Sequence, residues 1–148
     1  MGSPGSGWID CGVWSNACFW RWTPKAGEIP QEAVRLLKRV ERPSMEFDTD
    51  LACQLIKDQC ASLYLAISGE QLAGVLMFNV SNSVRLGKIL EIEGTSFLPG
   101  KAINQWPFVN AIAKQNDCQK IRAISSRALH KRFKKLKPLE AVFYAEVE

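Results

Sequence analysis

The chain has 148 residues, of which 47% are hydrophobic, and this is enough for one domain with a real core. No apolar run reaches the roughly 18 residues of a membrane-spanning helix, and no secretory signal opens the chain, so membrane and secreted proteins are disfavoured. The net charge is +4, and five cysteines lie at no spacing typical of zinc ligands. We therefore expect reduced thiols, no metal site and a cytoplasmic location.

The first 29 residues form a tryptophan-rich segment. Five large aromatic residues crowd into it: Trp8, Trp14, Phe19, Trp20 and Trp22. Either they fold back as core, or they form an exposed surface that contacts a protein partner or a second copy of the chain. The segment from residue 30 onward is predicted to have helices and a sheet of its own, which would make a complete domain without the extension. We therefore expect residues 1–29 to be an extension and possible interface, and residues 30–148 to be the domain.

Apolar periodicity predicts two helices after this extension. The first begins at Pro30, while the second is capped near Asp48 and ends near Gln59. The apolar faces are expected at Val34, Leu37 and Val40 in the first helix and at Leu51, Leu55 and Ile56 in the second.

The clearest pattern is a β-hairpin. Two apolar runs, 63–67 and 72–78, flank a turn centred on Gly69, where a positive φ meets no Cβ clash. A second turn is predicted at 81–83, and residues 88–93 alternate as a third strand. These three strands are expected to lie in one mixed sheet.

The rest of the chain alternates helices and strands. A helix is expected between 103 and 115, a short strand at 121–124, a basic helix at 127–136 and a final strand at 141–147. The order predicts an α/β (α+β) fold with a mixed, mostly antiparallel central sheet flanked by helices.

This order of elements resembles the GNAT (GCN5-related N-acetyltransferase) fold over residues 30–148. The predicted hairpin and the strand–loop–helix at 91–115 carry most of the resemblance, which implies acetyl-CoA as the cofactor. The segment Leu-His-Lys-Arg-Phe-Lys-Lys-Leu at 129–136, followed by a strand, also resembles the GNAT-like internal virion proteins of short-tailed phages. That second resemblance implies a phage protein located in the host cytoplasm or the virion.

The GNAT family holds the pyrophosphate of acetyl-CoA in a loop of the pattern Gln/Arg-x-x-Gly-x-Gly/Ala, which leads into a helix N-terminus. The aligned stretch here departs from the pattern, because Phe97 replaces the polar residue and Pro99 lacks a backbone donor. The cofactor-binding residues that the resemblance implies are Leu98, Gly100, Lys101 and Ala102. An ordinary loop entering a helix is the alternative.

The resemblance also implies a carboxylate base on the strand before this loop. Glu91 and Glu93 are the candidate catalytic residues, and they share one strand face because they are two residues apart. A solvated strand face is the alternative. In this family a tyrosine on the last helix often protonates the leaving thiolate. Here Phe133 stands at that level, and Tyr144 lies further along, on the final strand.

A basic stretch without acidic residues runs from Lys120 to Lys137. The helix predicted at 127–137 either binds a phosphate-bearing ligand or forms a solvated face.

These observations leave three candidate functions. The first is a GNAT-like protein of phage origin with a degenerate acyl-CoA site and a binding or structural role in the virion. The second is an active N-acetyltransferase that transfers acetyl from acetyl-CoA to an amine. The third is a nucleic-acid-binding module.

Overall fold

The structure is a computed structural model. It describes residues 3–39, 48–100, 104–124, 137–139 and 142–148. The chain divides into two compact units: the first contains Met1–Met77 and Gly94–Ile103, and the second contains Phe78–Glu93 and Asn104–Glu148. Two long strands, β4 (Gln71–Ser83) and β5 (Gly87–Phe97), contribute residues to both units.

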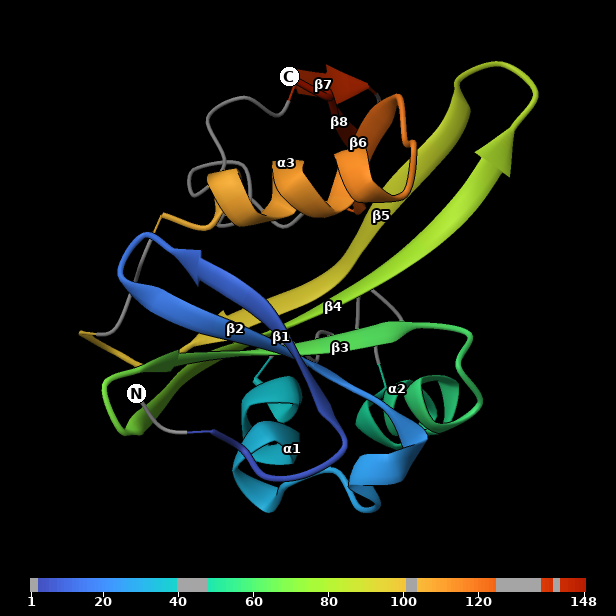
Figure 1. The fold of residues 1–148 in the computed structure, drawn as a ribbon. Helices are drawn as coiled ribbons and strands as arrows, with labels where there is room; N and C mark the ends of the chain where they lie inside the picture. The colour runs from blue at the N-terminus through green and yellow to red at the C-terminus, as the bar shows by residue number, and fades with distance from the viewer. Residues whose placement is uncertain (1–2, 40–47, 101–103, 125–136, 140–141) are drawn as a thin grey trace. The chain divides into compact units, whose positions relative to one another are not determined.

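The described strands form a mixed sheet in the hydrogen-bonded order β1-β2-β3-β4-β5-β6-β8-β7 (Figure 1). The remaining strands are β1 (Trp8–Trp14), β2 (Ala17–Trp22), β3 (Ser62–Ser68), β6 (Lys120–Ile124), β7 (Lys137–Leu139) and β8 (Val142–Glu146). The β5–β6 pair is parallel, whereas β1–β2, β2–β3, β6–β8 and β7–β8 are antiparallel. The predicted α/β class with a mostly antiparallel sheet is confirmed.

The tryptophan-rich segment is a β-hairpin that the sequence did not predict. Ser15 and Asn16 connect β1 to β2 with φ values of 50° and 65°, as a tight hairpin turn requires. Strand β2 then pairs antiparallel with β3, so that Phe19 lies opposite Ala66. Phe19 is 0% exposed and Trp22 is 6% exposed. Trp22 therefore belongs to the apolar core of the first unit and Phe19 is fully buried as well, while the boundary at residue 29 stays a prediction.

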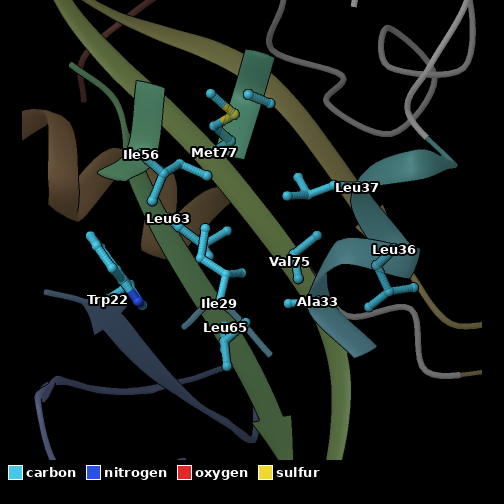
Figure 2. Packing of buried hydrophobic residues seen from close by; sticks show 11 residues of the cluster. Trp22, Ile29, Ala33, Leu36, Leu37, Ile56, Leu63, Leu65, Val75 and Met77 are labelled. Atoms are coloured by element: carbon cyan, nitrogen blue, oxygen red, sulfur yellow. The ribbon is translucent and has the colours of Figure 1, made fainter. Parts of the chain in front are cut away.

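Helices α1 (Gln31–Lys38) and α2 (Thr49–Lys57) cover one face of the strands of the first unit (Figure 1), and η1 (Pro24–Ala26) is a short 3-10 helix. Figure 2 shows the apolar core that they enclose with β2, β3 and β4. Its members are Trp22, Ile29, Ala33, Leu36, Leu37, Ala52, Ile56, Leu63, Leu65, Val75 and Met77.

Both helices begin near the predicted caps, but their buried faces differ in part from the prediction. In α1 the buried residues are Ala33, Leu36 and Leu37, while Val34 is partly buried and residue 40 lies outside the described range. In α2 the carboxylate of the N-cap Asp48 accepts hydrogen bonds from the first turn. Leu51 is 55% exposed, so its predicted place on the buried face is wrong. The buried stripe of α2 follows Ala52 and Ile56, four residues apart, and this spacing turns residue 51 outward.

The hairpin of β3 and β4 is confirmed, and Gly69 has the expected positive φ of 64°. The turn predicted at 81–83 is wrong, because β4 continues to Ser83. The chain reverses immediately afterwards, where the Ser83 hydroxyl oxygen accepts hydrogen bonds from the backbone N–H groups of Arg85 and Leu86 at 3.2 and 3.1 Å. The serine at the end of the predicted turn thus stabilises the turn that follows it.

In the second unit, α3 (Trp106–Gln115) packs through Phe108, whose ring lies 6.2 Å from that of Phe78 between centroids. Strand β8 matches the predicted final strand within one residue at each end. The predicted basic helix at 127–136 lies outside the described residues. Among the helices of the described ranges, none has the length and apolar character needed to cross a membrane.

Candidate active site

Glu91 on β5 forms an ion pair with Arg122 on β6 in the second unit. The parallel register places the two residues directly opposite each other. Arg122 donates to Glu91 Oε1 from Nε at 2.8 Å and also from Nη2. The Glu91 side chain is 20% exposed and the Arg122 side chain is 30% exposed, so the pair is largely shielded from water. The two hydrogen bonds from the guanidinium therefore fix the position of the Glu91 side chain.

Glu93, two residues further along β5, has a different environment. Burial raises the pKa of its carboxyl group above the ordinary value, and the negative charge of Glu91 raises this pKa further. A hydrogen bond with the Asn79 side chain on β4 and the positive charge of Arg122 act in the opposite direction. The net result is a carboxyl group with a raised pKa, which is the property of a tuned general base.

The two carboxylates thus divide their roles. Glu91 neutralises and anchors the Arg122 guanidinium, whereas Glu93 exchanges a proton at a pH closer to neutrality than an ordinary glutamate does. A group of this kind can take a proton from an ammonium or a hydroxyl group. The pair of residues was predicted from the sequence, but the difference between them was not.

The predicted cofactor loop is described in the first unit up to residue 100. The Leu98 backbone N–H donates to the Ala73 carbonyl oxygen at 2.8 Å, and Pro99 has no N–H. Gly100 has a φ of 75°, and no atom lies within 4 Å of the position that a Cβ would occupy. Of these three residues, Gly100 is thus the one whose backbone could face a phosphate group. Lys101 and Ala102 lie outside the described residues.

Gln105 was not singled out from the sequence. It precedes α3 as the N-cap residue and is only 2% exposed, and its Oε1 has no hydrogen-bond partner among the described residues. A buried amide oxygen without a donor is costly, and an N–H group of a bound molecule would satisfy it. Nothing in the sequence marks this glutamine, because its burial depends on tertiary packing.

The five aromatic residues of the N-terminal hairpin fall into two groups. Phe19 and Trp22 are core residues, whereas Trp8, Trp14 and Trp20 are partly exposed. The Trp14 indole N–H donates to the Cys11 carbonyl oxygen at 3.0 Å. The second group thus keeps surface that a partner can contact.

Asn79 and Arg122 are the site residues that the sequence did not identify as such. Arg122 was noted as one charge of the basic stretch, and only the parallel register of β5 and β6 brings it to Glu91. Within the described residues, no group of His, Cys, Asp and Glu side chains is arranged to hold a metal ion.

This sheet, with a parallel β5–β6 pair and a carboxylate-bearing strand before the loop, is the fold of the GNAT acetyltransferases. An acetyltransferase from Bacillus subtilis in complex with CoA is similar with a TM-score of 0.60 and 15% identity, covering 82% of this chain and 95% of that one. A GNAT family acetyltransferase from Elizabethkingia anophelis with acetyl-CoA bound gives 0.59 and 14%, covering 90% and 99%.

A third structure, a putative GNAT acetyltransferase from Desulfovibrio desulfuricans, gives a TM-score of 0.62 and 12% identity, covering 89% of this chain and 99% of that one. At these identities the likeness establishes the fold. No protein-family model and no curated protein matches the sequence.

Proposed function

We propose that the protein is an N-acyltransferase that uses acetyl-CoA and an amine, with Glu93 as the general base. The observation that carries this proposal is the unequal pair on β5, in which Glu91 is ion-paired with Arg122 while the pKa of Glu93 is raised. The presence of CoA or acetyl-CoA in two of the similar structures supports the choice of cofactor.

In the reaction, the Glu93 carboxylate accepts a proton from the acceptor ammonium and so frees the nitrogen lone pair. Acetyl-CoA, when bound, would supply the thioester carbon at which the C–N bond forms as the C–S bond breaks. The nitrogen then gives up its second proton to water, and the leaving CoA thiolate takes a proton back from that water, so that the products are the amide and the CoA thiol. Glu93 then releases its proton to water. Arg122 holds Glu91 in place throughout, and Asn79 orients the Glu93 carboxylate through their hydrogen bond.

For the cofactor, we propose the residues that the resemblance implied, Leu98, Gly100, Lys101 and Ala102. Gly100 has the main role, because its open surroundings let a phosphate approach the backbone. Since the Leu98 N–H is already used and Pro99 has none, the loop offers fewer donors than the family pattern. We therefore expect weaker binding of acetyl-CoA than a complete loop would give.

Calorimetric titration with acetyl-CoA, followed by a thiol-release assay with a panel of amines, tests the proposal. Wild type should bind and turn over, Gly100→Trp should lose binding, and Glu93→Gln should bind but lose turnover. Lys57→Gln on α2 is the control, since this exposed lysine pairs only with Glu28 among the described residues. Absence of binding at millimolar acetyl-CoA would rule the enzyme out.

A second candidate is a GNAT-like domain that binds a protein partner without catalysis. The shortage of backbone donors at Leu98 and Pro99 favours it, and the partly exposed Trp8, Trp14 and Trp20 offer a surface. Wild-type protein that binds a partner but neither binds nor turns over acetyl-CoA would identify this function.

The phage origin and virion role stay predictions, because they rest on residues 129–136, outside the described ranges. Nucleic-acid binding by the basic stretch 120–137 also stays a prediction, because residues 125–136 lie outside the described ranges, and a salt-dependent affinity for DNA or RNA would test it.

A further inference from the structure

A cavity of about 570 Å³ lies in the first unit, and its lining includes neither Glu91 nor Glu93. One wall is helix α1 with its C-cap residue, and the other is the turn between β3 and β4, the start of β4 and the residue that follows β5. Its apolar lining consists of Leu36, Leu72 and Leu98. This volume is typical of sites for small molecules, and three leucines provide a surface for an apolar group.

Charged side chains of both signs surround this apolar surface. Glu32, Arg35 and Arg39 come from the helix wall, and Glu70 comes from the hairpin turn. Glu32, Arg35 and Glu70 form no ion pair with any other described residue. Arg35 on the helix wall and Glu70 on the hairpin wall therefore face one cavity without an ion pair between them.

The charge pattern limits the kind of ligand. A simple anion attracted by Arg35 would also meet the carboxylates of Glu32 and Glu70, and a simple cation attracted by Glu70 would meet the Arg35 guanidinium. A molecule with one charge of each sign satisfies both walls. An arginine side chain binds a carboxylate through two parallel hydrogen bonds, and a glutamate accepts from an ammonium group.

We propose that this cavity binds a small zwitterion with an apolar side chain, namely a free α-amino acid of the leucine type. The ligand carboxylate contacts Arg35, its ammonium group contacts Glu70, and its side chain packs on Leu36, Leu72 and Leu98. Leu98 is also one of the residues proposed above to hold acetyl-CoA, but neither the ligand of this cavity nor its test requires acetyl-CoA or turnover.

Three probes of nearly equal size separate the charge requirements. L-leucine carries both charges, leucinamide only the positive one, and 4-methylpentanoate only the negative one. Backbone amide shifts of the ligand-free, full-length protein, followed by NMR during titration to on the order of 10 mM, report binding at Leu36 and Leu72. We expect saturable shifts for L-leucine, with an affinity about tenfold higher than for either single-charge probe.

Two variants assign the contacts. Arg35→Gln should weaken L-leucine about tenfold and leave leucinamide unchanged, whereas Glu70→Gln should weaken L-leucine about tenfold and leave 4-methylpentanoate unchanged. Lys38→Gln on the same helix and Asp117→Asn in the second unit are matched charge controls, because neither residue lines the cavity. Absence of saturable shifts with L-leucine overturns the proposal. Equal affinity for all three probes also overturns it, because the leucines alone would then account for binding.

Discussion

The ring of Phe97 lies against the backbone of Gly74. A Cβ at position 74 would lie 2.3 Å from Phe97 Cδ2, which is closer than side-chain atoms can approach each other. Position 74 on β4 therefore requires glycine, because the Phe97 ring occupies the space that a side chain would need. The two residues fix how the end of β5 lies on β4 immediately before the proposed cofactor loop.

We therefore predict that Gly74→Ala destabilises the protein by about 1–3 kcal/mol, as overpacking does in other cores. Phe97→Leu in the same chain should recover part of this loss, because it removes the ring that the new methyl group meets. Urea unfolding of both single variants and the double variant measures the coupling. If the single effects simply add, the close contact does not determine the stability at this position.

The rate of acyl transfer should rise with pH as Glu93 loses its proton. Glu93→Gln should lower kcat by about 10²–10⁴-fold with little change in acetyl-CoA affinity. Glu91→Gln removes a charge that raises the pKa of Glu93, so the rising limb of kcat/KM should move to lower pH. Arg122→Gln removes a charge that lowers this pKa and should move the limb to higher pH.

Lys120→Gln is the control for these pH profiles. Lys120 lies on the same strand as Arg122 but pairs with Glu146, and it is not among the groups that act on Glu93. Its profile should match that of wild type. Shifts of the same sign for Glu91→Gln and Arg122→Gln would contradict the assignment of their opposite effects.

The same carboxyl group should make stability depend on pH. The folded chain binds the Glu93 proton more tightly than the unfolded chain, so the free energy of unfolding falls as pH rises from the ordinary glutamate pKa through the raised one. Glu93→Gln should therefore be more stable than wild type at neutral pH, by less than about 1 kcal/mol because the group is partly solvated. Urea unfolding across pH measures this gain, which should vanish in acid where both states are protonated.

The N-terminal hairpin should be required for folding. Phe19→Ala should cost about 3–5 kcal/mol, since its ring is fully buried. Ile9→Ala on the neighbouring strand is the control and should cost much less, because Ile9 is 50% exposed. Deletion of residues 1–24 removes both Phe19 and Trp22 and should abolish the cooperative unfolding transition seen by circular dichroism. A truncated protein that still unfolds cooperatively would restore the view of this segment as a separate extension.

The parts of the fold that were predicted correctly depend on local patterns. Gly69 between two apolar runs specifies the β3–β4 hairpin, and Asp48 specifies the start of α2. The first two strands were missed because Asp10 and Gly12 interrupt the alternation of β1, where the register shifts between Asp10 and Val13.

For a related reason, only part of the geometry of the candidate site follows from the sequence. Two glutamates on one strand face follow from a period of two residues. The contact between Glu91 and Arg122 joins positions 31 residues apart, and it depends on a parallel pairing that no local pattern reveals. The raised pKa of Glu93 follows from burial and from neighbours on three strands, which the sequence alone does not supply.

The irregularity in β1 also bears on aggregation. Strand β1 lies at one end of the sheet and carries exposed Ile9 and Val13, which is the kind of edge to which another unfolded chain can add. Within the irregular segment, the Gly12 N–H donates to the Asp10 carboxylate at 2.8 Å, and the Cys11 carbonyl accepts from the Trp14 indole. The Gly12 N–H and the Cys11 carbonyl are thus hydrogen-bonded within the chain and are not available to pair with another strand. A straight β1 without the bulge would leave them available and would offer a template for fibril growth.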